Sequence, residues 1–156
     1  MAISESQKGR AIEQFVGARL ILQSNGMLRV SLPLVDDEGV DLVIGSRATD
    51  KTLLLQIKGR FSLSSRGHYR ADVRRATCRP GPNKSLLFVY YDQAKAALGD
   101  TCWLVPAPTF CKLLENQKGA RPVWIFDSTF GSKKDMGRQF RLPLKEVAAV
   151  LVKALQ

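Results

Sequence analysis

The sequence predicts a single α/β (or α+β) domain in which helices flank a mixed central sheet. Three observations predict this class. Apolar residues recur at helical spacing at both ends of the chain, short strand-like segments fill the middle, and one further helical pattern precedes the last strand. The 156 residues suit one hydrophobic core. We therefore predict one domain over residues 1–156.

The first helix is predicted over residues 5–23. At spacings of three and four, one side of it carries Ile12, Phe15, Val16, Arg19 and Leu20. Gly26 follows as the expected C-terminal stop, because glycine readily adopts the conformation that ends a helix. Residues 27–34 then alternate apolar and polar side chains, which is typical of a strand. Residues 35–39 are predicted to form a turn.

The middle of the chain is predicted to be strands. Residues 40–45 and 52–59 are apolar segments separated by a short polar turn, and they favour a hairpin. Residues 68–75 alternate apolar with charged side chains, so one face of that strand is charged. A Pro- and Gly-containing break at 79–83 leads to the apolar run 85–91, which predicts a central strand buried on both faces.

The last third of the chain is predicted to contain two strands, a short helix between them and a closing helix. The strands are 101–107 and 121–127, and the helix is 108–117 with a proline near its start. Residues 131–141 are a basic loop. Apolar residues recur at helical spacing over 143–156, so this segment is the closing helix.

The composition excludes several classes of protein. The N-terminal segment lacks the apolar stretch of a signal peptide, and no apolar run approaches the roughly 20 residues of a membrane helix. We therefore expect a cytoplasmic protein without a membrane partner. Three cysteines without a CxxC pair, together with a single histidine, argue against a disulfide framework and a zinc site. We expect that histidine, His68, to be a surface residue of a basic loop.

The charge of the chain points to a polyanionic partner. Lys and Arg number 24 against 14 Asp and Glu, a net charge of +10, which favours nucleic acid; a basic protein without such a role is the alternative. Basic residues concentrate in one stretch, which holds a single acid, Asp72. They are Arg60, Arg66, Arg70, Arg74, Arg75, Arg79 and Lys84. Arginine suits bidentate phosphate contacts, so we predict that these residues bind the DNA backbone.

The basic loop offers a second candidate surface for DNA. It carries Lys133, Lys134 and Arg138, which either extend the phosphate-binding surface or are simply solvated. Trp103 and Trp124 lie in apolar strands, and we expect both to pack in the core rather than to stack on bases.

The predicted hairpin carries polar residues inside apolar strands. Gln56 and Lys58 are two residues apart, so they share one face of their strand. In a compatible register Asp41 joins them on that face. A carboxylate and an amide oxygen are hard ligands that suit Mg²⁺, and a nearby lysine can stabilise negative charge or help to deprotonate a water. The alternative is that the sheet leaves these groups exposed to solvent.

A second carboxylate is available from the first helix. Glu13 lies at the edge of the apolar stripe, and Gly9 and Gly17 lie one turn before and after it. We expect these glycines to let the helix approach the sheet closely, which would bring Glu13 to the hairpin. The alternative is a solvated surface glutamate. The turn residues Asp36, Asp37 and Glu38 either add another carboxylate or form a solvated turn.

These segments resemble the PD-(D/E)xK nuclease superfamily. The stretches "GRAIEQFVGARLI", "DEGVDLVI" and "LLLQIKGR" follow its order of helix Glu, strand Asp and (D/E)xK strand, and the resemblance spans about residues 8–112. It is closest to the branch that contains Holliday-junction resolvases and type IV restriction nucleases. The resemblance implies a restriction-endonuclease-like mixed sheet flanked by helices. It also implies hydrolysis of phosphodiester bonds in duplex or branched DNA.

The resemblance further implies the roles of the site residues. Glu13, Asp41 and Gln56 would be the ligands of Mg²⁺, with Mn²⁺ as an alternative, and Lys58 would be the catalytic lysine. Gln56 departs from the pattern, because the family's third position is an acid. An amide oxygen can still bind Mg²⁺ but brings no charge.

Two alternatives to an active nuclease stay open, and so does the oligomeric state. The first is a catalytically weak or inactive DNA-binding protein on the nuclease fold, which Gln56 keeps open. The second is a subunit of a larger assembly that binds no nucleic acid. By analogy with nucleases that cut two strands, a homodimer is a further expectation.

Overall fold

The structure is a computed structural model that describes residues 3–35, 38–115, 117 and 122–156. Its helices are α1 (Glu5–Gln23), α2 (Ala107–Leu114) and α3 (Val147–Ala154), with short 3₁₀ turns η1 (Arg138–Phe140) and η2 (Leu144–Glu146). Its strands are β1 (Leu28–Ser31), β2 (Leu42–Ser46), β3 (Thr52–Arg60), β4 (His68–Arg74), β5 (Lys84–Asp92), β6 (Ala97–Pro106), β7 (Val123–Thr129) and β8 (Arg141–Pro143).

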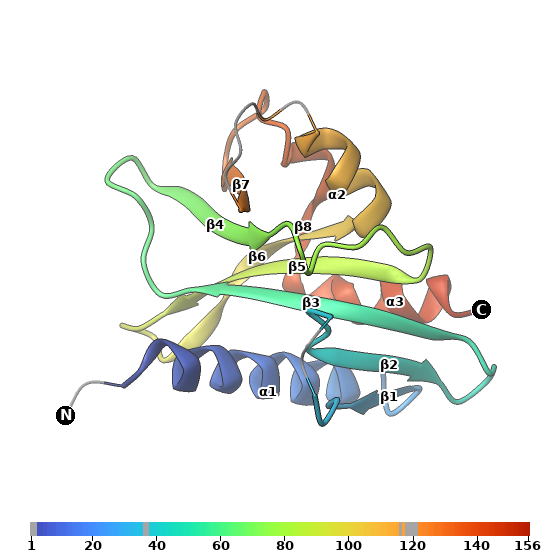
Figure 1. Cartoon of the computed structure of the whole chain (residues 1–156). Coiled ribbons are helices and arrows are strands. Elements are labelled where there is room, and N and C mark those ends of the chain that lie inside the picture. The colour runs from blue at the N-terminus through green and yellow to red at the C-terminus, as the bar shows by residue number, and fades with distance from the viewer. Residues whose placement is uncertain (1–2, 36–37, 116, 118–121) are drawn as a thin grey trace.

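Six strands form the central sheet, in the order β1-β2-β3-β5-β6-β8. Only the β3–β5 pair is parallel, so the sheet is mixed and mostly antiparallel (Figure 1). The predicted class, a mixed sheet flanked by helices, is confirmed. One expectation is wrong, because β4 leaves the central sheet and pairs with β7 in a second, two-stranded sheet. The excursion through β4 carries the chain from β3 to its parallel neighbour β5.

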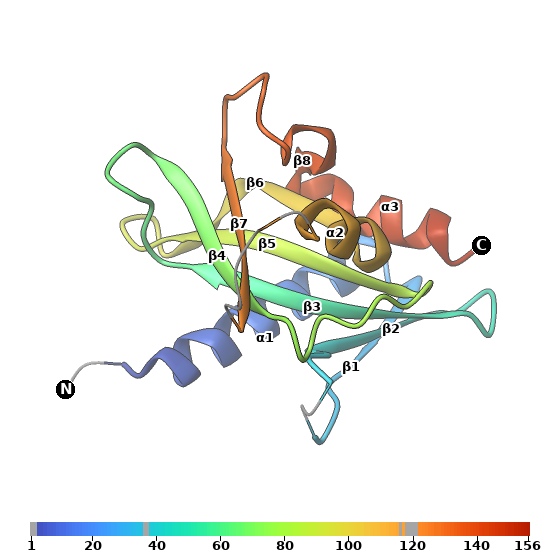
Figure 2. The same cartoon turned by 45° about the horizontal axis from the view of Figure 1, so that its top comes forward.

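Each face of the central sheet has its own core. On one face α1 and α3 cover residues such as Leu42, Leu55 and Leu87. On the other face α2 and the β4–β7 sheet enclose an aromatic cluster, with Phe88 and Phe126 stacked at 4.0 Å between ring centroids. Figures 1 and 2 show α1 beneath the sheet and the β4–β7 pair with α2 above it. The molecule is therefore layered, with the sheet in the middle.

The first helix forms where the sequence predicts it. Ser4 caps it in a reciprocal pair of hydrogen bonds with Gln7, and Gly26 ends it at φ +72°. The helix packs on the backbone of β3 at Gly59, where an added Cβ would lie 2.1 Å from Ile12 Cδ1. Only glycine at this position leaves room for the isoleucine side chain. This contact determines how closely α1 packs against β3.

Several predicted boundaries shift. The strand predicted over 27–34 ends at Ser31, since residues 32–35 leave the sheet. The strand predicted over 101–107 begins at Ala97, because β5 and β6 form a hairpin whose turn includes Ala96 at φ +49°. The closing helix is shorter than predicted and follows η2. The basic loop contains η1, and Trp103 lies fully in the core, as expected.

Candidate active site

Asp41 lies where β2 separates from β3. The hairpin pairs Leu42 with Leu55, and one step further the main-chain N–H of Asp41 donates to Leu55 O at 3.0 Å. The main-chain N–H of Ile57 then donates to Asp41 Oδ2 at 2.5 Å. The Asp41 carboxylate therefore accepts the hydrogen bond from β3 that a main-chain carbonyl would accept if β2 began earlier in the chain. This contact places it at the edge of β3.

Gln56 and Lys58 share the face of β3 that meets the aromatic core, as the strand alternation predicts. Their parallel partners are Leu86 and Phe88, which belong to that core. Gln56 is 2% exposed, and among the described residues its Oε1 has no hydrogen-bond partner. Leaving an amide oxygen buried without a donor costs about 1–3 kcal/mol. This orphaned oxygen makes Gln56 a candidate ligand position.

Gly39 confines the Gln56 side chain. It adopts φ +64°, and a Cβ there would lie 2.6 Å from Gln56 Nε2 and 2.7 Å from Thr77 Cβ. A larger residue would therefore be strained and would also displace the amide. Gly39, the last residue of the predicted turn, thus also shapes the surroundings of Gln56.

Glu13 and Asp41 line one pocket of about 260 Å³, together with Gly9 and Arg10 from α1 and residues of the segment 32–40. The role predicted for the two glycines is half right. A Cβ at Gly17 would contact Val30 Cγ1 at 3.4 Å, so this glycine does bring α1 onto the sheet. A Cβ at Gly9 would meet only Glu13 Oε1, at 4.0 Å, so no close approach to the sheet depends on Gly9.

The structure brings Glu13 and Asp41 together in one pocket. Gln56 and Lys58 lie together on the face of β3 that meets the aromatic core. Gln56 and Lys58 do not line the pocket that holds Glu13 and Asp41. Within the described ranges no three His, Cys, Asp or Glu residues cluster to hold a metal. Binding of one ion by Glu13, Asp41 and Gln56 stays a prediction.

The acidic turn lies mostly outside the described residues, since Asp36 and Asp37 are not among them. Glu38 is described and is exposed. Its carboxylate forms an ion pair with Arg79 at 3.4 Å. Its main-chain oxygen accepts a hydrogen bond from Lys84 Nζ.

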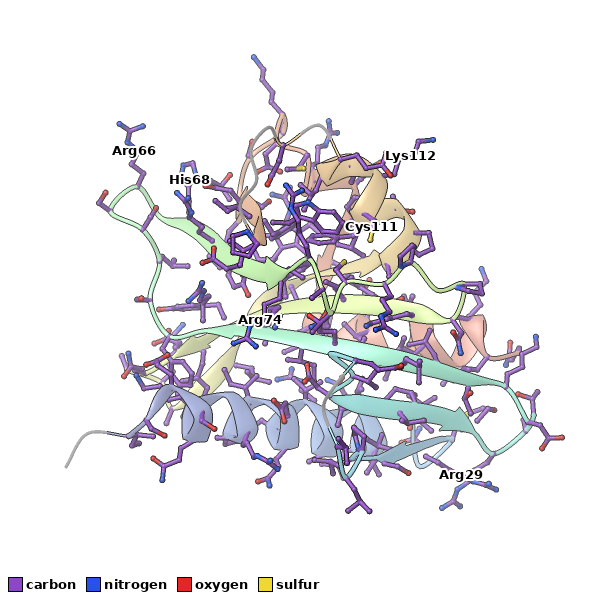
Figure 3. All side chains as sticks on the ribbon, in the orientation of Figure 1. Arg29, Arg66, His68, Arg74, Cys111 and Lys112 are labelled. Atoms are coloured by element: carbon purple, nitrogen blue, oxygen red, sulfur yellow. The ribbon has the colours of Figure 1, made fainter. Side chains whose placement is uncertain are left out.

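Most predicted phosphate-binding residues are exposed, and Figure 3 shows Arg66 projecting from the loop before β4. The charged face of β4 presents Arg70 and Arg74 to solvent, as the alternation predicts. Arg60 is half-buried, and its Nε donates to Arg70 O at 2.7 Å, which joins β3 to β4. The exposed set also includes Arg79, Lys133, Lys134 and Arg138.

Arg75 is half-buried and contacts Trp124 and Gln117. Its guanidinium carbon lies 5.4 Å from the centre of the Trp124 ring, and its Nη2 donates to Gln117 O at 3.2 Å. Trp124 also packs edge-to-face against Phe110, so it supports the aromatic core, as expected.

Lys84 corrects one expectation, because it is not placed to bind phosphate. It is 5% exposed, and its Nζ donates to Glu38 O at 2.7 Å and to Thr77 O at 2.9 Å. Burial lowers the pKa of Lys84, while nearby groups, Asp41 among them, oppose that shift. The lysine joins the turn that carries Gly39 to the β4–β5 connection. It therefore holds the surroundings of Gln56 together.

We predict that Lys84→Met destabilises the protein by about 1–3 kcal/mol, because two carbonyl oxygens lose their donor. Thermal or urea unfolding measures this change. Lys112→Met, at an exposed lysine of α2 labelled in Figure 3, is the matched control and should leave stability unchanged. A weaker salt dependence of DNA binding in Lys84→Met, with unchanged stability, would restore the phosphate-binding role.

Two buried cysteines lie near this lysine, and no sequence pattern predicted their contact. Cys78 Sγ and Cys111 Sγ lie 3.3 Å apart, although their residues are distant in the chain. Burial raises the pKa of Cys78 to about 12, and the hydrogen bond with Cys111 adds to the rise. Cys78 is therefore a protonated thiol at neutral pH.

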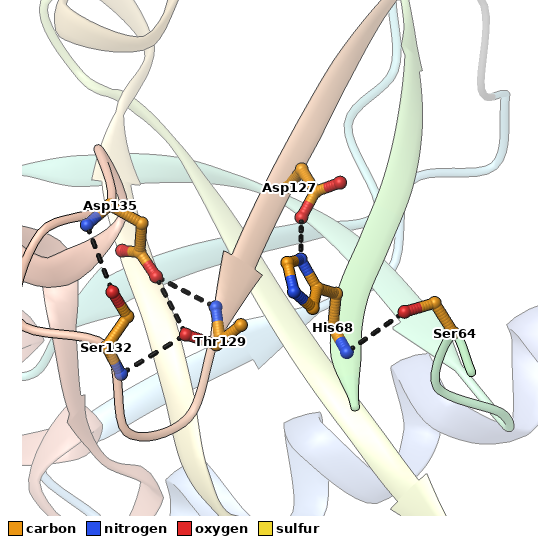
Figure 4. A network of polar contacts seen from close by, with 6 residues as sticks. All are labelled: Ser64, His68, Asp127, Thr129, Ser132 and Asp135. Atoms are coloured by element: carbon orange, nitrogen blue, oxygen red, sulfur yellow. Dashed lines mark hydrogen bonds and ion pairs between the residues drawn. The ribbon is translucent and has the colours of Figure 1, made fainter. Parts of the chain in front are cut away.

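His68 begins β4, which agrees with the strand predicted over 68–75 and not with the basic loop expected for this histidine. Its Nδ1 is 2.9 Å from Asp127 Oδ1 on β7 (Figure 4). Nearby, Asp135 accepts hydrogen bonds from the N–H and hydroxyl of Thr129. Burial alone would raise the pKa of Asp135, but its hydrogen bonds outweigh this effect and lower it. These contacts shape the basic loop, and no local sequence pattern predicts the β4–β7 pairing behind them.

No helix in the described part of the chain has both the length and the apolar character needed to span a bilayer. A comparison with protein-family models and a comparison with curated proteins each found no match. The fold itself is informative. A mostly antiparallel central sheet flanked by helices, with this connectivity, is an endonuclease-like fold.

A solved structure shares this fold along nearly the whole chain. It is that of a bacterial homing endonuclease, I-Ssp6803I, with a TM-score of 0.59 and 20% sequence identity. The match covers 98% of this chain and 94% of that one. At this identity the likeness establishes the fold.

Proposed function

We propose that this protein is a metal-dependent endonuclease that hydrolyses phosphodiester bonds in duplex or branched DNA. The observation that carries the proposal is the pocket that Glu13 and Asp41 share. On the face of β3 that meets the aromatic core, the buried side-chain oxygen of Gln56 has no hydrogen-bond partner among the described residues. The shared fold is that of a homing endonuclease, which supports DNA as the substrate. The motif of Glu13, Asp41, Gln56 and Lys58 favours the PD-(D/E)xK superfamily. The resolvase-like branch is part of the same proposal.

The donor atoms of Glu13, Asp41 and Gln56 are of the kind that suits Mg²⁺, with Mn²⁺ as the alternative. Two carboxylates and an amide oxygen are hard ligands, and a cation would supply the partner that Gln56 Oε1 lacks. The bound ion would polarise a phosphoryl oxygen and lower the pKa of a coordinated water. Glu13, Asp41 and Gln56 would hold it.

Lys58 would act on the attacking water or on the developing negative charge. It lies one alternation beyond Gln56 on the same face of β3. Its main-chain oxygen accepts a hydrogen bond from the buried Tyr69 hydroxyl, which joins the end of β3 to β4. This hydrogen bond therefore fixes the main chain at Lys58 next to β4, the strand that carries Arg70 and Arg74.

Cleavage of DNA in the presence of Mg²⁺ or Mn²⁺ tests the proposal. Duplex and branched substrates should be cut, and chelation of the metal by EDTA should stop the reaction. DNA that is bound but never cut, with Lys58→Ala indistinguishable from the native protein, would favour the DNA-binding protein without catalysis. No binding at any salt concentration would favour the subunit of a larger assembly.

The arginines of β4 would hold the phosphate backbone, which positions DNA without reading its sequence. We predict that Arg70→Ala and Arg74→Ala each reduce the slope of log affinity against log salt by about 1. Arg29→Ala on β1, far from Arg66 and Arg74 in Figure 3, is the control and should leave the slope unchanged. Fluorescence anisotropy at several salt concentrations measures both. Equal effects of all three variants would contradict a surface centred on β4.

A further inference from the structure

The outer side of α1 carries a second apolar stripe. Its members follow at spacings of four, three and four, and all are exposed: Ala11, Phe15, Ala18 and Leu22. Phe15, which the spacing predicts to lie with the sheet-facing residues, is instead 50% exposed, and Leu22 is 76% exposed, whereas the sheet-facing residues of α1 are buried. In Figure 1, α1 runs along the lower part of the molecule. The neighbouring Gln14 and Ile21 add no charge on one side of the stripe, and Lys8 and Arg19 border its other side.

We propose that this stripe is the interface of a homodimer in which α1 packs against α1 of a second copy in antiparallel orientation. A row of apolar residues at alternating spacings of three and four is the pattern by which one helix packs on another. A contiguous exposed apolar patch on a soluble domain marks an interaction site. The proposal is independent of the proposed nuclease activity.

The alternation of large and small residues selects a second copy as the partner. When the helices run antiparallel with Ala11 opposite Leu22 of the second copy, Phe15 lies opposite Ala18 of that copy. Two-fold symmetry repeats both pairs, so every large side chain meets a small one. In a parallel pair Phe15 would lie opposite Phe15 of the second copy, and Ala11 opposite its Ala11. Large side chains would then clash at one level and small ones would leave a gap at the next.

A pocket beside the stripe extends the complementarity. It has a volume of about 250 Å³, and Ala11, Phe15, Phe61 and Tyr91 contribute to its lining. The ring of Phe15 lies 6.0 Å from that of Tyr91, so these side chains form a continuous apolar wall. Leu22 of the second copy, opposite Ala11, would lie at the mouth of this pocket.

The size and charge of the interface predict a weak dimer. The 19-residue helix is about 28 Å long, so we expect the pair to bury less than roughly 1,200 Å², the lower end of the range for standard interfaces. Two copies at +10 also repel each other, and salt screens that repulsion. Dimerisation should therefore strengthen with salt, whereas DNA binding weakens with it.

Sedimentation equilibrium at about 0.5 M salt and from about 10 to 300 µM protein tests the dimer. The dimer fraction should rise with concentration, and Leu22→Glu should weaken association by at least about tenfold, because it places a charge in the apolar stripe. Val150→Glu, at an apolar residue of α3 that is 43% exposed, is the matched control and should dimerise normally. A native protein that stays monomeric throughout, or equal losses in both variants, would overturn the proposal.

Cysteine cross-linking tests the orientation. Ala11→Cys combined with Leu22→Cys should give a covalent dimer when oxygen and copper–phenanthroline oxidise the thiols, and each single variant should stay monomeric on denaturing gels. The native cysteines are buried and do not compete. Cross-linking by the single variants would indicate a parallel pair and overturn the antiparallel arrangement.

Discussion

Asp41→Asn is expected to slow DNA cleavage by about 10²–10³-fold while leaving DNA affinity nearly unchanged. The amide oxygen of asparagine can still accept the hydrogen bond from Ile57 N that now ends on Asp41 Oδ2. The edge of β3 therefore keeps its geometry at a cost of about 1 kcal/mol. What disappears is one negative charge in the pocket shared with Glu13. Single-turnover cleavage and anisotropy on the same substrate separate the rate from the affinity.

Asp50→Asn is the matched control for this substitution. Asp50 is an exposed residue of the β2–β3 turn, so the change removes the same charge away from the pocket. Its cleavage rate should equal that of the native protein. An Asp41→Asn protein that cuts at the native rate would remove the carboxylate from the catalytic site and leave the nuclease proposal without its central residue.

Gly59→Ala is expected to destabilise the fold by about 1–3 kcal/mol. The new Cβ would lie 2.1 Å from Ile12 Cδ1 and 3.1 Å from Ile12 Cγ2, and Ile12 is 1% exposed in the core beneath the sheet. The isoleucine cannot move away freely, so α1 must shift from β3. Because Glu13 follows Ile12, such a shift also moves the carboxylate that lines the pocket with Asp41. Urea unfolding measures the stability, and cleavage kinetics report the movement.

Shortening Ile12 should relieve this overlap. Ile12→Val removes the terminal methyl group and costs about 0.5–1.5 kcal/mol by itself. Combined with Gly59→Ala, it should restore part of the stability, so the double variant is more stable than the sum of the single effects predicts. Strict additivity would show that the two side chains do not compete for the same space, and the contact would not set the position of α1.

The local elements could be predicted because their signals lie within short stretches. Helix α1 and the β2–β3 hairpin follow from spacing and turn composition, and Gln56 and Lys58 share a face because they are two residues apart. The separate β4–β7 sheet could not be predicted. Its strands are far apart in the chain, and the alternation of β4 shows one apolar face without showing what covers it.

The same distinction applies to the basic residues. The alternation of β4 predicts that Arg70 and Arg74 face solvent, and they do. Nothing local distinguishes Lys84 from them, because its burial arises from two carbonyl oxygens, of Glu38 and Thr77, that other segments bring to it. The approach of Cys78 to Cys111 likewise depends on how α2 packs over β5.

By itself, the sequence determined the periodicity of each element, the surplus of positive charge and the apolar stripe of α1 that faces the core. Each of these is a property of neighbouring residues, and backbone geometry converts it directly into a face or a turn. Only the tertiary structure decided that Glu13 meets Asp41 in one pocket, that Gly59 admits Ile12 and that Lys84 is enclosed. Such contacts depend on the relative placement of whole elements, which the combined packing of both cores determines.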